Sequence, residues 1–279
     1  MGTATCNMNG TLAGKVAVVT GASRGIGEAI CYRLAMEGAM VVPSARTARA
    51  SDHILEGTIN DTAAHIQACG GEAFAVQCNL ASSADRENLI EETSNHFGPV
   101  DILVSNAAIT YFIPVLEFSA KRYDVMFEVQ VKAPFHLAQL VLPSMIERAS
   151  GQIVNISSAA AFHPKADAPG GHGGTVYGMC KAALERFTTG LAQEQFDNNV
   201  AVNVISPGLV ATPGVLHHHL INESNKARVQ PVEYIAEAVY QLCIADMDMS
   251  GRIDHAAPFL EELGIEPALT LKEFPQGET

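Results

Sequence analysis

The sequence predicts a doubly wound α/β domain, in which helices cover both faces of a parallel sheet of about seven strands. Three observations lead to this fold. Short runs of apolar and β-branched residues alternate with longer helical stretches along the chain. These short runs are almost continuously apolar, which is typical of parallel strands that are buried on both sides. A glycine-rich turn follows the first run, at residues 20–27.

The N-terminal half begins with a buried strand, Lys15–Thr20, and a helix over residues 25–37 that places Ile30 and Leu34 on its apolar side. Gly70 and Gly71 end a later helix, because glycine readily adopts the left-handed conformation there. The remaining predicted elements of this half are strand 40–44, helix 54–69, strand 73–77, helix 85–97 and strand 101–105.

The C-terminal half begins with a long helix over residues 120–148, with a kink at Pro134 because proline lacks a donor N–H. An eight-stranded β/α barrel has the same alternation, but only about seven strands are found and the glycine-rich turn favours an open sheet. The elements predicted after the long helix are strand 152–157, helix 176–196, strand 201–205, helix 232–245 and a short seventh strand near 252–255.

Composition excludes several classes of function. The chain has 279 residues, of which 48% are apolar and 17% charged, an ordinary globular composition. Its net charge of −13 gives an acidic surface that repels phosphate backbones and anionic lipid. The longest apolar runs are strand-sized, far short of the ~20 residues that cross a bilayer. No nucleic-acid partner and no membrane role are expected.

The cysteines and the N-terminus indicate a reducing, cytoplasmic location. The six cysteines are scattered without a C-x-x-C pair, so neither a zinc site nor a disulfide framework is expected. The first residues lack the basic start and apolar run of a signal peptide. Residues 217–219 are three consecutive histidines, but neighbours on a helix point in different directions, and no metal site is expected there.

We expect one domain over residues 12–257. Residues 1–11 precede it as an N-terminal extension, and residues 258–279 follow it as an acidic C-terminal tail.

Candidate binding residues follow the ends of the predicted strands, where ligands bind in open parallel sheets. Gly21, Gly25 and Gly27 allow a tight turn and a close approach of backbone to a pyrophosphate, and the helix that follows presents its positive end to anions. The alternative is a plain strand–turn–helix glycine cluster. Asn106 and Ala107 follow a later strand, and small residues there leave room for a planar ligand.

Tyr177 and Lys181 form the candidate acid/base pair. Their i, i+4 spacing puts both on one face of a helix, with the ammonium beside the phenol. A nearby cation lowers the pKa of a tyrosine from its reference of ~10 and makes it usable as an acid or base near neutral pH. The alternative is an ordinary, half-exposed pair of side chains.

These motifs resemble the classical type of the short-chain dehydrogenase/reductase family over residues 12–253. They are the T-G-x-x-x-G-x-G turn at residues 20–27, the N-A-A element at 106–108, a serine after the next strand, and Y-x-x-x-K at 177–181. The resemblance implies a Rossmann-like fold and hydride transfer between a nicotinamide cofactor and a carbonyl or alcohol. Because this family is commonly dimeric or tetrameric, it also implies a homo-oligomer, with a homotetramer as one expectation.

The resemblance implies roles for individual residues. Tyr177 would donate a proton in reduction or accept one in oxidation, Lys181 would lower its pKa and bind ribose hydroxyls, and Ser158 would bind the substrate oxygen. Ser157 would pack behind Ser158, and Asn79 stands where the family usually has an aspartate against adenine. The expected cofactor-binding residues are Gly21, Ser23, Arg24, Gly25, Ile26, Gly27, Arg46, Asn79, Leu80, Asn106, Ala107, Tyr177, Lys181, Pro207, Gly208, Val210 and Thr212.

The sequence departs from the family pattern in two places. Gln130 stands in the long helix where the family has an asparagine that supports a proton relay to Lys181, so the relay either survives in shifted geometry or weakens. Ser158 and Tyr177 also lie further apart than in most members, and the extra segment, residues 162–174, is rich in Gly and Pro. We expect that insertion to border the substrate pocket.

The second strand predicts which cofactor is preferred. NAD-preferring members carry an aspartate where Ala45 stands, whereas Arg46 follows it here and Arg24 lies within the glycine turn. Guanidinium groups pair with the 2′-phosphate of NADP, so NADP is expected over NAD. The alternative is that both arginines are solvated surface charges.

The sequence therefore predicts an NADP-dependent oxidoreductase that acts on a carbonyl or secondary alcohol, such as a ketone or hydroxysteroid, with Tyr177 as acid/base. Two alternatives remain. One is a 3-oxoacyl reductase acting on acyl chains, which shares the core and differs in its pocket loops. The other is a catalytically weak, NADP-binding scaffold, suggested by Gln130.

Overall fold

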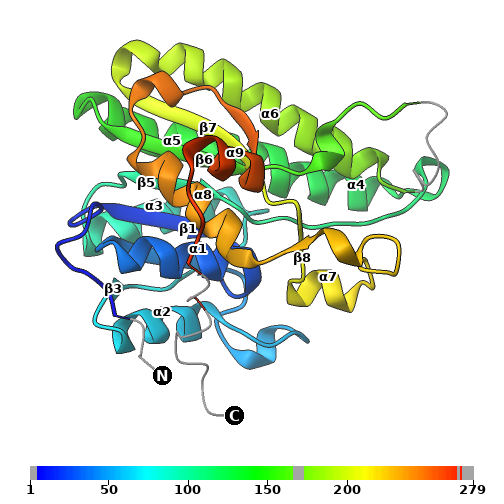
Figure 1. Ribbon diagram of the computed structural model, residues 1–279, viewed down its shortest axis with the longest axis horizontal. Helices are drawn as coiled ribbons and strands as arrows, with labels where there is room; N and C mark the ends of the chain where they lie inside the picture. Colours follow the sequence, from blue (N-terminus) through cyan, green and yellow to red (C-terminus); the bar gives the residue numbers. More distant parts are fainter. Residues whose placement is uncertain (1–4, 166–172, 269–270, 272–279) are drawn as a thin grey trace.

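The computed structural model describes residues 5–165, 173–268 and 271, and places one parallel sheet at the centre of the molecule (Figure 1). The order of its strands is β10-β7-β6-β5-β1-β2-β3, with β4 also paired to β2. The described strands leave two edges, so the sheet is open and the barrel alternative is excluded. The strands are β1 (Val16–Thr20), β2 (Met40–Ala45), β3 (Glu72–Ala73), β4 (Val76–Gln77), β5 (Ile102–Ser105), β6 (Gly151–Ile156), β7 (Val200–Ser206) and β10 (Ile253–His255).

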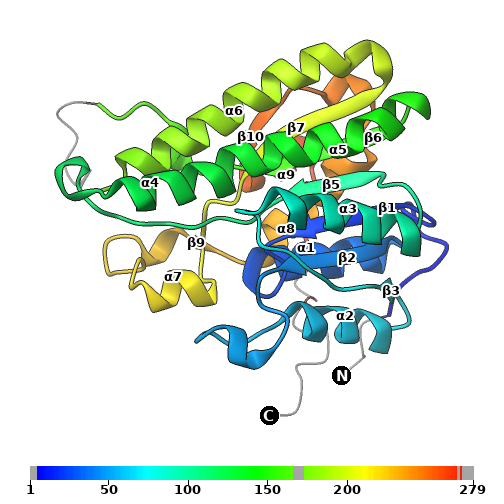
Figure 2. The same ribbon diagram turned by 180° about the vertical axis from the view of Figure 1, so that it is seen from behind.

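Helices cover both faces of the sheet, which confirms the doubly wound fold (Figures 1 and 2). Successive β1 residues face opposite sides: Ala17 and Val19 pack with α1, α2, α8 and α9, whereas Val18 packs with α3, α5 and α6. The helices are α1 (Gly25–Met36), α2 (Ile59–Ala68), α3 (Ser83–His96), α4 (Ala120–Phe127), α5 (Ala133–Glu147), α6 (Thr175–Gln195), α7 (Pro213–His217), α8 (Val232–Ile244) and α9 (Ala256–Leu263). Among the described residues, no helix has the length and apolar character of a membrane span.

Two predicted elements differ from the structure. The helix expected from residue 54 begins at Ile59, because Thr58 and Asp61 form a capping box in which each side chain accepts the other's backbone N–H. The strand expected over residues 73–77 is divided into β3 and β4. Between them, the ring of Phe74 stacks on His96 of α3, with 4.0 Å between ring centroids.

The long helix is irregular just before Pro134, where a kink was expected. Residues Glu128–Lys132 form a π-helical turn between α4 and α5. Pro134 has no N–H to donate to the carbonyl of Gln130, four residues earlier, so the regular α-helical pairing is interrupted there. Gln130 lies in the middle of this turn, and the turn packs against α6.

The packed domain continues past the expected boundary at residue 257. Helix α9 spans that boundary, and its Phe259 and Leu260 are each 1% exposed within the core shared with α1 and α8. At the other end, the backbone N–H of Cys6 donates to the carbonyl of Cys69 at 2.9 Å. Parts of the expected N-terminal extension and acidic tail therefore pack on the domain, while residues 1–4, 269–270 and 272–279 lie outside the described residues.

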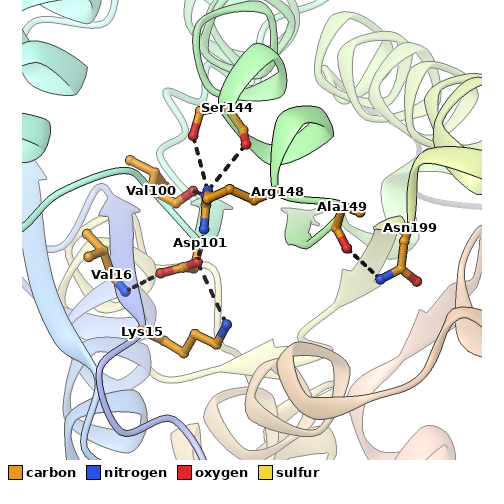
Figure 3. Close-up of polar contacts among 8 residues, drawn as sticks. All are labelled: Lys15, Val16, Val100, Asp101, Ser144, Arg148, Ala149 and Asn199. Atoms are coloured by element: carbon orange, nitrogen blue, oxygen red, sulfur yellow. Dashed lines mark hydrogen bonds and ion pairs between the residues drawn. The ribbon is translucent and has the colours of Figure 1, made fainter.

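A buried carboxylate joins β1, β5 and the C-terminal end of α5 at the amino edge of the sheet (Figure 3). Asp101 is 8% exposed and accepts the backbone N–H of Val16 at 3.0 Å. The guanidinium of Arg148 forms an ion pair with the Asp101 carboxylate and also donates to the carbonyl of Val100 at 2.8 Å. This network stabilises the edge of the sheet opposite the candidate site.

Candidate active site

The glycine turn between β1 and α1 forms a cradle that only glycine permits. Gly21 and Gly25 have φ of +67° and +63°, in the left-handed region. A Cβ on Gly27 would lie 2.3 Å from the carbonyl oxygen of Gly21. Arg24, the N-cap of α1, makes no side-chain hydrogen bond to the first turn of that helix, so its side chain does not occupy the N–H groups there. The cradle therefore fits the pyrophosphate of a dinucleotide.

The residues that follow β5 support this turn. The side-chain amide of Asn106 donates to the carbonyl oxygens of Thr20 at 2.8 Å and Gly21 at 3.2 Å. The backbone N–H groups of Asn106 and Ala107 both donate to the Thr20 hydroxyl, at 3.1 and 3.2 Å. Asn106, one of the expected cofactor-binding residues, thus uses its side-chain amide to hold the glycine turn in place.

The segment after β7 reaches the same turn from the other side. It forms β8 (Leu209–Val210), which pairs with β9 (Val229–Gln230), a pair that the sequence did not predict. A Cβ on Gly25 would lie 3.2 Å from the side chain of Thr212, and the Thr212 hydroxyl accepts the N–H of Val215 at 3.3 Å. The segment that carries the expected cofactor-binding residues Val210 and Thr212 therefore lies against the cradle.

Ser158, Tyr177 and Lys181 come together where β6 ends and α6 begins. Tyr177 is hydrogen-bonded to Ser158. Lys181 is 2% exposed, and its ammonium lies 5.7 Å from the Tyr177 ring centroid and donates to the carbonyl of Ile156 at 2.8 Å. A Cβ on Gly178 would lie 2.5 Å from the carbonyl oxygen of Ala160, so glycine lets α6 approach the Ser158 turn closely.

Ser157 lies behind this group, as the sequence predicted. It is 3% exposed, and its hydroxyl donates to the Glu185 carboxylate at 2.6 Å. Glu185 lies one helical turn beyond Lys181, and its negative charge acts to raise the pKa of Lys181. This carboxylate connects the end of β6 to the helix that carries the candidate acid/base pair.

The pKa of Tyr177 differs from the sequence prediction. Burial raises the pKa of this phenol above its ordinary value, and the hydrogen bond from Ser158 only partly opposes that effect. Burial also lowers the pKa of Lys181 to about 8, although Cys180 and Glu185 act in the opposite direction. The expected lowering of the Tyr177 pKa by Lys181 is therefore not realised in this structure, because burial dominates at both groups.

Gln130 lies in the π-helical turn and is 1% exposed. Its Nε2 donates to the carbonyl of Ile109 at 3.0 Å, so it holds the chain that leaves the N-A-A element. Its Oε1 is buried and has no partner among the described residues. A buried amide oxygen without a protein partner suits an ordered water.

Arg46 and Arg24 are both near the end of β2 but differ in their surroundings. Arg46 is exposed directly after β2. Arg24 instead directs its guanidinium at three backbone carbonyls, those of Leu55, Glu56 and Gly57, at 3.1, 2.7 and 2.7 Å. The guanidinium of Arg24 therefore binds the segment after β2. We expected it to pair directly with a cofactor phosphate, but its hydrogen-bond partners here are backbone carbonyls.

The residues that the resemblance places against adenine follow β4. Asn79 is exposed, and its side-chain oxygen accepts the N–H of Ala81 at 3.2 Å. Leu80 is 8% exposed, and its carbonyl accepts from Arg86, which is itself 1% exposed. The amide nitrogen of Asn79 therefore remains the group that could face an adenine.

An aromatic residue that the sequence did not single out lies near the candidate acid/base pair. Phe112 is 46% exposed, and its ring packs edge-on against Tyr177 with centroids 6.0 Å apart. A Cβ on Gly173 would lie 2.5 Å from the Phe112 backbone, so the far end of the expected insertion contacts it. Residues 166–172 of that insertion lie outside the described residues, and no local sequence signal marks Phe112.

The three consecutive histidines do not form part of a ligand cluster in the described structure. The rings of His217 and His218 meet edge to face, 5.1 Å apart. Over the described ranges, no group of three or more His, Cys, Asp or Glu side chains gathers as metal ligands would.

Known proteins are similar to this chain in sequence and in fold. A family model described as short chain dehydrogenase matches residues 15–219. The chain belongs to the short-chain dehydrogenase family. As the resemblance predicted, it is an NAD(P)-dependent oxidoreductase of that family.

Relatives of several kinds are similar to this chain. Dehydrogenase/reductase SDR family member 4 of Homo sapiens is 36% identical over 202 residues, covering 72% of this chain and 68% of that protein. The 3-oxoacyl-[acyl-carrier-protein] reductase of Synechocystis is 35% identical over 202 residues, covering 72% and 76%. A metagenomic short-chain oxidoreductase, solved in complex with NADP, superposes with a TM-score of 0.68 at 30% identity, covering 85% and 94%.

Proposed function

We propose that the protein transfers a hydride between NADP and a ketone or secondary alcohol, with Tyr177 as the acid/base. One observation carries the proposal: the Tyr177 phenol is hydrogen-bonded to Ser158 while the Lys181 ammonium lies 5.7 Å from its ring. These groups lie at the same carboxyl edge of the sheet as the glycine cradle, where ligands bind in open parallel sheets.

The chemistry follows from the state of each group. A bound nicotinamide supplies the hydride in reduction and accepts it in oxidation. The Ser158 hydroxyl orients the substrate oxygen beside Tyr177. Because burial raises the pKa of Tyr177, the phenol keeps its proton and can give it to that oxygen when a ketone is reduced. Lys181, with a pKa of about 8, is close enough to neutrality to restore the proton to Tyr177.

The preference for NADP is supported by the end of β2. Arg46 is exposed there. Ala45 stands at the position where a carboxylate would accept a hydrogen bond from the ribose 2′-hydroxyl of NAD, so no such acceptor is present. The NADP complex of the metagenomic relative is consistent with this choice.

An assay of a panel of ketones and hydroxysteroids with NADPH and with NADH tests both the proposed reaction and the preference for NADP. Turnover is followed by loss of the reduced-nicotinamide absorbance. We expect turnover of at least one ketone, with kcat/KM about tenfold or more higher for NADPH, equivalent to one charge-assisted contact. A tenfold preference for NADH would contradict the cofactor proposal. NADPH binding without turnover of any carbonyl would contradict the enzymatic role and favour the scaffold alternative.

A 3-oxoacyl reductase is the second candidate, favoured by the Synechocystis relative of that name. Including a 3-oxoacyl thioester in the panel separates the two. A kcat/KM for the thioester well above that of every simple ketone would assign the acyl-chain reaction. The weak-scaffold alternative is favoured only by Gln130, whose buried Oε1 lacks a protein partner where a proton relay is expected.

A cytoplasmic homo-oligomer is part of the proposal. All six cysteines are free thiols, which suits a reducing compartment. Phe135 of α5 is 46% exposed and its ring lies 5.8 Å from that of Phe187 of α6, so an apolar surface lies across these two helices. Light scattering of the purified protein should give the mass of a dimer or tetramer, whereas a monomer at micromolar concentration would contradict it.

A further inference from the structure

The segment between β2 and α2, residues 48–58, is held in a defined conformation. The Asp52 carboxylate accepts the N–H groups of Ala48 and Arg49 at 3.0 and 2.9 Å. The side-chain amide of Asn60, in α2, donates to the carbonyl of Ala48 at 2.8 Å. This bond ties the start of the segment to the helix that follows it. In both views the segment lies next to α7 (Figures 1 and 2).

Arg24 clamps this segment to the glycine turn. Its three hydrogen bonds reach consecutive carbonyls, those of residues 55–57. Gly57 has φ of +93°, and a Cβ there would lie 2.5 Å from the carbonyl oxygen of Ser23. Only glycine therefore lets the segment approach the turn this closely. The hydrogen bonds of Arg24 hold the segment in that position.

His53 is presented by this clamped segment. Its Nδ1 accepts the N–H of Leu55 at 3.0 Å, so the proton of the neutral ring resides on Nε2, which is left as a donor. The charged groups that act on the ring are basic and come from three other places: Arg24 in the glycine turn, Arg46 after β2 and His217 on α7. The nearest acid in the chain, Asp52, is directed at backbone N–H groups instead.

This gathering of basic groups is unusual for a chain with a net charge of −13. Like charges repel, and burial together with these neighbours lowers the pKa of His53. An anion that accepts hydrogen bonds from several donors would relieve the repulsion. A phosphate monoester at the end of β2 has that chemistry.

We propose that His53 is a specificity-determining residue for NADP, donating from Nε2 to the 2′-phosphate beside Arg46, and that Arg24 is the positioning residue that holds the His53 segment. This inference rests on the proposed preference for NADP. It differs from the sequence expectation, in which Arg24 itself pairs with the phosphate.

Calorimetric binding of two adenosine ligands tests the role of His53 without turnover. Adenosine 2′,5′-bisphosphate carries the discriminating phosphate, and adenosine 5′-monophosphate lacks it. His53→Asn keeps a side-chain oxygen that can accept the Leu55 N–H and removes the far nitrogen of the ring. We expect the bisphosphate to bind about tenfold more weakly to this variant and the monophosphate to bind within twofold of wild type, as for loss of one hydrogen bond to a charged group.

Arg49→Gln is the matched control, because Arg49 is an exposed cation on the same segment and is not among the groups that act on His53. We expect it to change the affinity for neither ligand by more than twofold. Bisphosphate affinity retained in His53→Asn would overturn the inference, as would equal weakening of both ligands. An equal loss in Arg49→Gln would show a general field effect and overturn it too.

Arg24→Lys tests the positioning role. It keeps the positive charge, but an ammonium cannot reach three carbonyls in the geometry of a guanidinium. If Arg24 acts through His53, this variant should lose the same preference for the bisphosphate, and the double variant with His53→Asn should be no weaker than either single variant. Additive losses would overturn the positioning role, because they would mean that Arg24 contacts the phosphate independently.

The wild-type protein separates failure of this inference from failure of the proposed function. Equal affinity of wild type for the two adenosine ligands would remove the NADP preference itself. A clear wild-type preference for the bisphosphate that survives in His53→Asn would leave the proposed function intact and remove only the role of His53.

Discussion

Lys181 should cost the protein stability, and replacing it with methionine should make the fold more stable at neutral pH. Lys181 is 2% exposed, and its one side-chain hydrogen bond to a described protein group goes to the carbonyl of Ile156. Burial lowers its pKa from 10.5 to about 8. That difference corresponds to about 3 kcal/mol, since a tenfold change in a proton equilibrium is about 1.4 kcal/mol.

The net effect of Lys181→Met is smaller, because the carbonyl of Ile156 loses a partner at a cost of about 1 kcal/mol. We therefore expect the variant to be about 2 kcal/mol more stable than wild type at pH 7. Methionine fills a similar volume without a charge, so no large cavity offsets this gain.

The pH dependence follows from the lowered pKa. Below about pH 8 the amine is charged in both the folded and unfolded chains, and the full cost is present. Between about 8 and 10.5 the folded amine loses its proton while the unfolded one keeps it, so wild-type stability rises with pH through this window. The advantage of Lys181→Met should therefore shrink to near zero by about pH 9.5.

Urea unfolding of both proteins at pH 7 and at pH 9.5 measures these differences. A variant that is less stable than wild type at pH 7, or an advantage that does not change with pH, would refute the reasoning. Catalytic activity should be lost in the same variant, because a residue retained at a cost in stability is expected to serve the site.

Two further predictions concern other buried groups. Gln130→Leu should lower kcat about tenfold or more, as for a lost proton-transfer contribution, while changing stability by less than about 1 kcal/mol. Unchanged kcat in steady-state assays would show that Gln130 takes no part in the relay. Asp101→Ala should lower the free energy of unfolding by about 3 kcal/mol, because it leaves the N–H of Val16 and the guanidinium of Arg148 without their buried acceptor. Denaturant unfolding measures this loss, and a value below about 1 kcal/mol would contradict the structural role given to the network.

The fold could be predicted because it depends on local patterns. The apolar runs and the glycine turn are short-range features, and they identified the parallel sheet. Tyr177 and Lys181 share a face of one helix at i, i+4 spacing, so their proximity was also accessible from the sequence.

Features that depend on distant contacts were not predictable. The Arg24 guanidinium could be assigned to a phosphate from its position in the turn, but its real partners are carbonyls of residues 55–57, brought there by a long loop. The raised pKa of Tyr177 arises from burial of its phenol. The i, i+4 spacing of Tyr177 and Lys181 carries no information about that burial. Phe259 was assigned to a tail because acidic residues surround it, yet it packs into the core.

Tyr177→Phe tests the central claim most directly. The substitution removes one hydroxyl and keeps the ring that packs against Phe112. With the best substrate of the panel, turnover should fall at least about a hundredfold, the scale of a lost general acid, while the Kd for NADPH stays within twofold of wild type. Near-normal turnover in this variant would contradict the assignment of Tyr177 as the acid/base.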